Sequence, residues 1–126
     1  MSPKSAVISL GSNIDALINI DLAVSILYNR FDVINFAGPV QTTPVGLTDQ
    51  PDFFNAAILL NTDLDQPALI HSLKEIEDEV GRDRSRPHYG PREIDLDLVL
   101  WNGDVVDNDY YERDFLRKLV DEVLKD

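Results

Sequence analysis

The alternation of two kinds of apolar spacing limits the possible folds of this chain more than any other feature of its sequence. Short apolar runs, or apolar residues at every second position, predict strands over residues 6–10, 32–44, 53–61 and 94–101. Apolar residues spaced by three and four predict helices over residues 15–30 and 66–80. The resulting order, β-α-β-β-α-β, predicts an α+β sandwich in which one antiparallel sheet carries its helices on one face.

Local signals refine these elements. The polar residues of Gly11-Ser12-Asn13 are expected to cap the first helix. Gly38-Pro39 interrupts the second strand and indicates an edge strand or a bulge. The first helix is expected to turn one apolar stripe inward, made of Leu17, Ile20, Val24, Leu27 and Phe31.

The remainder of the chain predicts a hairpin and a last helix. Asn102-Gly103 is a strong hairpin turn, and it leads to a short strand at Val105-Val106. Residues 109–125 are expected to form a helix that packs through Phe115, Leu119 and Val123.

The composition excludes several classes of function. A formal net charge of -12 argues against a nucleic-acid binder, since such proteins need a broad cationic surface. The absence of cysteine excludes disulfides and thiolate metal sites. Neither a signal peptide nor an apolar run of membrane-spanning length is visible. We therefore expect one domain over residues 1–126, in a cytoplasmic protein that contacts neither nucleic acid nor membranes and binds a small anionic ligand. The sequence leaves the oligomeric state open and slightly favours a monomer.

The cationic side chains concentrate in residues 82–92 (RDRSRPHYGPR), which hold four of the eleven lysine and arginine residues. Asp95 and Asp97 follow on one face of a predicted strand, with Cα atoms about 6.6 Å apart. A cationic loop beside paired carboxylates fits a polyphosphate bridged by divalent cations. Two alternatives remain open: the aspartates solvate an exposed sheet face, and the arginines form ion pairs with surface acids.

A second segment fits a flat ligand. Phe53 and Asn55 share the strand face opposite the predicted core, and an aromatic ring beside an amide can stack on a heterocycle and hydrogen-bond it. His71 and His88 have no metal-ligand spacing, and no serine, histidine and carboxylate cluster indicates nucleophilic catalysis. Glu77 taken alone is a glutamate on a helix surface.

Three motifs resemble those of the 6-hydroxymethyl-7,8-dihydropterin pyrophosphokinase family of folate biosynthesis. They are Ile8–Asn13, Thr42–Ala56 with its Thr-Thr-Pro-Val-Gly and Gln-Pro-Asp-Phe-Phe-Asn-Ala parts, and Gly90–Asp97. The resemblance implies a ferredoxin-like α+β fold, ATP as co-substrate and two magnesium ions. It also implies transfer of the β,γ-diphosphoryl group of ATP to the pterin hydroxymethyl oxygen, with release of AMP.

The same resemblance assigns roles to individual residues. Asp95 and Asp97 match magnesium ligands, and the catalytic groups it implies are Arg82, Arg92 and Asp97. Phe53 matches an aromatic that stacks on the pterin and Asn55 a side chain that hydrogen-bonds it. Four residues match positions whose backbone contacts the same ring: Thr42, Thr43, Pro44 and Val45. Five residues match positions that contact the nucleotide: Glu77, Arg82, Arg84, Arg92 and Leu98.

The chain also departs from the family pattern. Members usually carry arginine and tryptophan at the positions of His88 and Tyr89, and a longer stretch after the strand at Val105-Val106. Because that stretch supplies much of the adenine side, we expect a short or divergent member with reduced activity. Phe115 matches the second aromatic of the pterin site or, by its spacing, a core residue of the last helix. A paralogue that binds a pterin or nucleotide without transfer, and a partner-binding ferredoxin-like domain, remain alternatives.

Overall fold

The computed structural model describes residues 3–44, 46, 49–87 and 90–125, and the predicted order of its first six elements is confirmed. These elements are β1 (Lys4–Ser12), α1 (Ala16–Arg30), β2 (Asp32–Thr42), β3 (Phe53–Thr62), α2 (Gln66–Val80) and β4 (Asp95–Trp101). The chain continues with β5 (Asp104–Val105), α3 (Asp109–Glu112) and α4 (Asp114–Val123). Among the residues just given, no helix is both long and apolar enough to cross a membrane.

The strands form one antiparallel sheet in the order β2-β3-β1-β4-β5. The first four strands have the ferredoxin-like arrangement, in which each helix connects two strands that are not neighbours. β5 is added at the edge through the predicted hairpin, where Asn102 and Gly103 have φ angles of 49° and 86°. It begins one residue earlier than expected, since Leu100 pairs with Val105 and Trp101 with Asp104.

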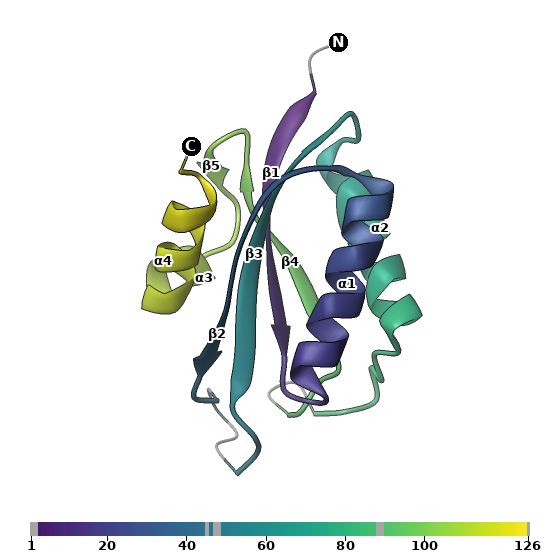
Figure 1. The fold of residues 1–126 in the computed structure, drawn as a ribbon, viewed down its shortest axis with the longest axis vertical. Coiled ribbons are helices and arrows are strands. Elements are labelled where there is room, and N and C mark those ends of the chain that lie inside the picture. Colours follow the sequence, from purple (N-terminus) through teal and green to yellow (C-terminus); the bar gives the residue numbers. More distant parts are fainter. Residues whose placement is uncertain (1–2, 45, 47–48, 88–89, 126) are drawn as a thin grey trace.

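Helices cover both faces of the sheet, so the prediction of helices on one face only is wrong. Figure 1 shows α1 and α2 on one side of the strands and α3 and α4 on the other. The reason lies in the strands themselves. In β3, Ile58 and Leu60 point to one face and Ala57 and Leu59 to the other, and both sets pack against apolar neighbours. A sheet that is apolar on both faces needs two covering layers.

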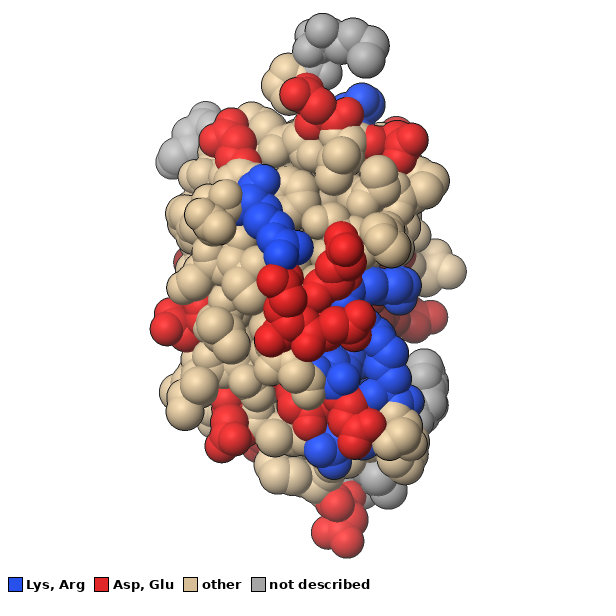
Figure 2. All heavy atoms as spheres, turned by 90° about the vertical axis from the view of Figure 1, so that its right-hand side faces the viewer, with Lys and Arg blue, Asp and Glu red and all other residues tan. Residues whose placement is uncertain are grey.

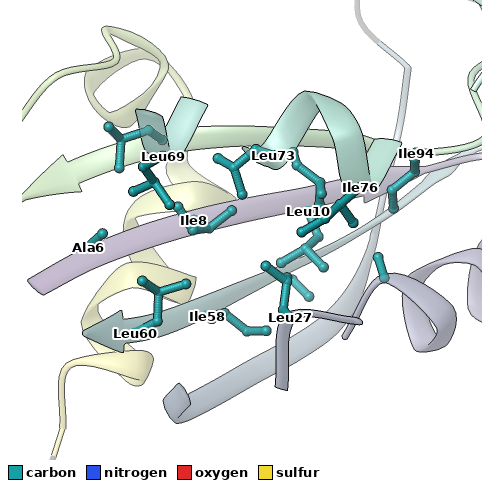
Figure 3. Close-up of a cluster of buried hydrophobic side chains, with 14 of the residues drawn as sticks. Ala6, Ile8, Leu10, Leu27, Ile58, Leu60, Leu69, Leu73, Ile76 and Ile94 are labelled. Carbon is teal, nitrogen blue, oxygen red and sulfur yellow. The ribbon is translucent and has the colours of Figure 1, made fainter. Parts of the chain in front are cut away.

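The larger core lies between the sheet and the helices α1 and α2 (Figure 3). Leu73 and Ile76 of α2 meet Ile8 and Leu10 of β1 there, and α1 contributes Ile20, Ala23 and Leu27. The expected stripe of α1 is therefore partly wrong. Leu17 lies in the first turn and stays 56% exposed, so the buried stripe begins one turn later, at Ile20.

The second core lies under α4, and it corrects the prediction for the last helix. The backbone of Arg113 is extended, with φ -116° and ψ 106°, so the expected helix is divided into α3 and α4. Leu119 and Val123 pack on the sheet as predicted, whereas Phe115 is half-buried at the rim of this cluster. The buried residues of the cluster are Val7, Ala37, Ala57, Val99, Leu100, Leu116, Leu119, Val120 and Val123.

The ends of α2 determine how the chain enters the cationic segment. Asp65 caps the helix by accepting a hydrogen bond from the N–H of Ala68. Gly81 ends it with a φ of 108°, as predicted, and both Gly81 and Arg82 donate their N–H groups to the carbonyl of Glu77. The cationic segment thus starts from a fixed turn beside Glu77.

β2 is an edge strand with an irregular register, as Gly38-Pro39 predicted. The pairing with β3 shifts between Ala37 and Val40. Gly38 has a φ of 99°, and a Cβ atom there would lie 2.8 Å from the carbonyl oxygen of Asn55. The glycine therefore allows the edge strand to approach β3 closely at Asn55.

Candidate active site

Asp95 and Asp97 lie on the face of β4 that α3 and α4 cover, while Leu96 and Leu98 point into the larger core. The alternative in which these aspartates solvate an open sheet face is therefore wrong. They line a pocket with Gly11 from β1 and Arg113 from the α3–α4 connection. Burial is the main cause that raises the pKa of Asp97 from 3.8 to about 8, and the neighbouring charge of Asp95 adds to it.

Two arginines are bonded to Asp95. Its Oδ1 atom accepts a hydrogen bond from Nη1 of Arg82, and its Oδ2 atom accepts one from Nη1 of Arg92, both at 3.1 Å. Both guanidinium groups are themselves largely buried. The two ends of the cationic segment therefore meet at one carboxylate of β4.

Glu77 is the most deeply buried charged residue among those described, with 2% of its surface exposed. Its carboxylate accepts hydrogen bonds from Arg82 Nη1 at 2.8 Å, from Arg84 Nη2 at 3.1 Å and from the N–H of Leu96 at 2.7 Å. The description of Glu77 as a helix-surface residue is therefore wrong. It joins α2, the cationic segment and the start of β4 beneath the pocket.

The remaining described arginines of the segment also pair with acids, as one alternative expected. Arg84 binds Asp78, and Arg86 binds Glu93, which also accepts the N–H of Asp83 at 3.0 Å. Figure 2 shows opposite charges side by side on the face that α2 covers. Before any ligand is bound, the guanidinium groups are thus already oriented by the protein's own carboxylates.

Arg82, Arg84 and Arg92 line a polar pocket of about 460 Å³, the arginine pocket, which reaches the carboxylates of β4. Its other lining residues come from α2, from β4, from the turn before α3 and from α3–α4. They are Lys74, Glu77, Asp95, Leu96, Asp97, Asp107, Asp109, Glu112 and Arg113, beside Arg82, Arg84 and Arg92. The pocket therefore brings cationic and acidic groups together at the first residues of β4.

A smaller pocket of about 160 Å³, the aromatic pocket, opens beside the arginine pocket and is lined by two phenylalanines. Phe53 and Phe115 both line it, although they come from β3 and α4. Asn55 donates from Nδ2 to Thr42 Oγ1 at 2.6 Å, which orients its amide at the wall. The guanidinium carbon of Arg92 lies 5.8 Å from the centre of the Phe53 ring.

The predicted site residues are largely brought together here. Thr42 and Thr43 line the aromatic pocket, and Pro44 is not among its lining residues. Val45, His88 and Tyr89 lie outside the described residues. Phe115 packs on the second core, as its spacing predicted, and it also lines the aromatic pocket. Its contact with a pterin stays a prediction.

Leu98 lies apart from the other site residues. It is buried on the α2 side of β4, where it lines a third pocket with Ile70 and Lys74. This pocket also includes Asp97 and Asp107, which border the arginine pocket. An apolar wall therefore continues directly from the charged region.

Two further residues of the site were not selected from the sequence. Arg113, at the break between α3 and α4, and Asp109, the first residue of α3, line both the aromatic and the arginine pocket. The position of Arg113, two residues before Phe115, was the signal that could have identified it, since the resemblance had already matched Phe115 to the pterin site.

Within the part of the chain that the structure describes, no group of three or more acidic or histidine side chains could hold a metal ion by itself. The pair Asp95 and Asp97 is therefore the relevant donor set. A magnesium ion is commonly held by one or two carboxylates together with water and substrate phosphates. The pair fits such an ion, because Asp95 and Asp97 lie on one face of β4 and line the same pocket, so their oxygens can be shared with a cation.

Comparisons with known proteins show which proteins this chain resembles in sequence. The family model for 7,8-dihydro-6-hydroxymethylpterin-pyrophosphokinase matches residues 7–125. A "Folate synthesis bifunctional protein" of Arabidopsis thaliana is 38% identical over 100 residues, which cover 78% of this chain and 21% of that protein.

Two bacterial relatives carry the name 2-amino-4-hydroxy-6-hydroxymethyldihydropteridine pyrophosphokinase. The one from Bacillus subtilis is 36% identical over 107 residues, covering 82% of this chain and 64% of that protein. The one from Haemophilus influenzae is 33% identical over 109 residues, covering 83% and 67%. The match thus spans about two thirds of the bacterial relatives and about a fifth of the plant protein. By the match over residues 7–125 and these identities, the chain belongs to the 7,8-dihydro-6-hydroxymethylpterin-pyrophosphokinase family.

Proposed function

We propose that this protein transfers the diphosphoryl group of ATP to the hydroxymethyl group of 6-hydroxymethyl-7,8-dihydropterin and releases AMP, in folate biosynthesis. One observation carries the proposal. Asp95 and Arg92 line both the aromatic pocket and the arginine pocket, so a flat acceptor and a polyphosphate would meet at the carboxylates of β4. Family membership and the names of the bacterial relatives support the same reaction.

Asp95 and Asp97 are the residues that would hold magnesium, and we propose two ions, as the resemblance implies. Magnesium bound here would neutralise phosphate charge and lower the pKa of the acceptor hydroxyl. Asp97 would then be ionised, because a nearby cation opposes the burial and the Asp95 charge that raise its pKa. Asp95 would give up its contacts with Arg82 and Arg92 in the same step.

The released guanidinium groups of Arg82 and Arg92 would donate to phosphate oxygens. Such charge-assisted hydrogen bonds become stronger as charge develops on the transferred group. Glu77 would keep Arg82 aimed at the pocket, since it holds the same nitrogen from behind at 2.8 Å. The arginines thus supply charge without a large rearrangement of the segment.

The aromatic pocket would orient the acceptor. Phe53 and Phe115 would contact the faces of the pterin, and the amide of Asn55 would hydrogen-bond its edge with Thr42 fixing the amide. The hydroxymethyl oxygen would attack the β-phosphorus while the bond from that phosphorus to the α,β-bridging oxygen breaks. The proton of the hydroxymethyl group would pass to Asp97 or to solvent. AMP would leave and keep the bridging oxygen. Positioning of this kind lowers the barrier without covalent chemistry.

The nucleoside of ATP would lie along the third pocket. Leu98 and Ile70 provide an apolar wall there, and Lys74 borders both this pocket and the arginine pocket. ATP would then extend from Leu98 across Asp97 toward Arg82.

A second function has one observation in its favour. Asp107, Asp109 and Glu112 line the arginine pocket and would repel a polyphosphate. A paralogue that binds a pterin and does not transfer the diphosphoryl group would tolerate these acids.

One experiment separates the two functions. Calorimetry is performed with 6-hydroxymethyl-7,8-dihydropterin, with a non-hydrolysable ATP analogue plus magnesium, and with both, and AMP formation from ATP is followed by chromatography. Binding of both ligands with AMP release that requires the pterin is expected. Pterin binding without AMP release would favour the paralogue, and absence of pterin binding would contradict the proposed reaction.

A further inference from the structure

Asn13 makes more long-range hydrogen bonds than a capping residue would. It was expected to cap α1, but the N-cap position of α1 is Asp15, which makes no side-chain cap hydrogen bond. Asn13 instead lies directly after β1 and is only 6% exposed. A buried amide of this kind has to satisfy its donors and its acceptor within the protein.

The amide of Asn13 joins two segments that are distant in sequence. Its Nδ2 atom donates to Gln50 Oε1 at 2.8 Å and to the carbonyl of Pro51 at 3.0 Å. Its Oδ1 atom accepts the N–H of Arg92 at 2.9 Å, and its own N–H donates to the carbonyl of Arg92 at 3.2 Å. Both donors and the acceptor of one side chain are therefore used to connect the entry of β3 with the end of the cationic segment.

These two segments carry groups that face each other in the pocket. Pro51 precedes Phe53 by two residues, and the guanidinium of Arg92 lies 5.8 Å from the ring of Phe53. Both groups are thus attached to the same anchor, and Asn13 is not among the residues that line the aromatic pocket. A change at Asn13 would alter their separation without touching any reacting atom.

We propose that Asn13 is a positioning residue that fixes the spacing between Phe53 and Arg92, and so couples the affinities for the flat acceptor and for the nucleotide. The coupling rests on the proposed function, whereas the anchoring does not. A nucleotide that draws Arg92 onto its phosphates would move Pro51 through Asn13, and the acceptor site would adjust with it. The coupling would be reciprocal, because it is a property of binding free energies.

Two substitutions separate the halves of the connection. Asn13→Asp keeps an oxygen that can accept the N–H of Arg92 and removes the N–H donors to Gln50 and Pro51. Asn13→Ala removes the acceptor and the donors together. Asn19→Ala is the matched control, because Asn19 Nδ2 donates to the Ile14 carbonyl within the same connection. All variants are prepared as the full chain, and the melting temperature of each is recorded.

The binding measurement uses 6-hydroxymethyl-7,8-dihydropterin, alone and with a saturating non-hydrolysable ATP analogue plus magnesium. For Asn13→Asp we expect pterin affinity to fall about ten-fold while analogue affinity changes less than about three-fold. For Asn13→Ala we expect the enhancement of pterin affinity by the analogue to disappear. Parent-like pterin affinity and enhancement in both Asn13 variants, or an equal loss in Asn19→Ala, would overturn the proposal.

Hydrogen exchange without ligands tests the anchoring separately. In Asn13→Ala the N–H of Arg92 loses its acceptor, so its exchange is expected to be at least about ten-fold faster, while amides of the inner strand β3 such as that of Ile58 keep their protection. Unchanged exchange at Arg92 would overturn the proposal whatever the ligands do. A parent protein that binds no pterin would contradict the proposed function, and in that case the exchange result alone decides the role of Asn13.

Discussion

Asp97 lies beside Asp95 on one face of β4, and this proximity adds to burial in raising the pKa of Asp97 to about 8. A raised pKa means that the folded protein favours the neutral acid more than the unfolded chain does. The stabilisation associated with neutral Asp97 is complete below its ordinary pKa of 3.8 and is lost as the pH rises toward 8. Without metal, folding at neutral pH therefore requires Asp97 to take up a proton, and above about pH 8 it requires burial of the Asp97 charge, and both oppose folding.

Replacement of Asp97 by asparagine should stabilise the metal-free protein at high pH. The asparagine side chain would keep the shape of the aspartate and remove the buried charge, so we expect Asp97→Asn to melt about 5 °C or more above the parent at pH 8 in EDTA. At pH 4 the difference should vanish, since Asp97 of the parent is then neutral. Thermal melts at pH 4, 6 and 8 provide the test, with Asp121→Asn as the surface control. A constant difference across this range would contradict the assignment.

Asp95→Asn should have opposite effects on two anionic ligands. Loss of the carboxylate removes a magnesium ligand, so binding of a magnesium–nucleotide analogue should fall at least about ten-fold. The same change frees Arg82 and Arg92 from their contacts with Asp95, so inorganic tripolyphosphate in EDTA should bind at least about three-fold more tightly.

Calorimetry at low and moderate salt measures both affinities of Asp95→Asn. Asp121→Asn controls for the change in net charge, because it removes an exposed acid of α4. Weaker tripolyphosphate binding by Asp95→Asn would show that Asp95 does not compete for the arginines.

Glu77→Ala should destabilise the fold more than loss of a surface ion pair would. The substitution leaves the N–H of Leu96 without its acceptor and removes one of the two carboxylates that bind Arg82, the one beneath the pocket. We expect a loss of about 2–4 kcal/mol in the free energy of unfolding by urea denaturation. Glu79→Ala is the matched control on the same helix, since Glu79 pairs with Arg30 at the surface and should cost about 0–1 kcal/mol. Equal losses would mean that Glu77 is no more important than a surface acid.

The elements predicted correctly are those whose signals are local. The periods of β1, α2 and β4 and the turn residues Gly81 and Asn102-Gly103 are visible within a few neighbours, and the structure confirms them. The prediction that Asp95 and Asp97 point to the same face of the sheet also followed from the two-residue period of a strand.

The errors arose where distant segments meet. The apolar residues on the second face of β3 were visible, but nothing local showed that α4 would cover them. Asn13 binds Gln50, Pro51 and Arg92, which are separated from it by 37, 38 and 79 positions in the sequence. No local spacing of residues indicates such contacts. The burial of Glu77 likewise depends on Arg82, Arg84 and the first residues of β4.

Phe53 and Phe115 should differ in how they affect binding and stability. Phe53→Ala should weaken binding of 6-hydroxymethyl-7,8-dihydropterin by about 1–3 kcal/mol through lost stacking and apolar contact. A nucleotide analogue should bind as before. Phe115→Ala should weaken pterin binding and also lower the melting temperature, because its side chain packs on the second core.

Phe115→Leu distinguishes the two roles of this residue, and it completes the test. Leucine keeps much of the packing on the second core and lacks the aromatic face, so we expect near-parent stability with pterin affinity reduced at least about five-fold. Calorimetry and thermal melts of Phe53→Ala, Phe115→Ala and Phe115→Leu provide the comparison. If Phe115→Leu binds the pterin as the parent does, Phe115 acts only as a core residue, and Phe53 would form the aromatic contact without it.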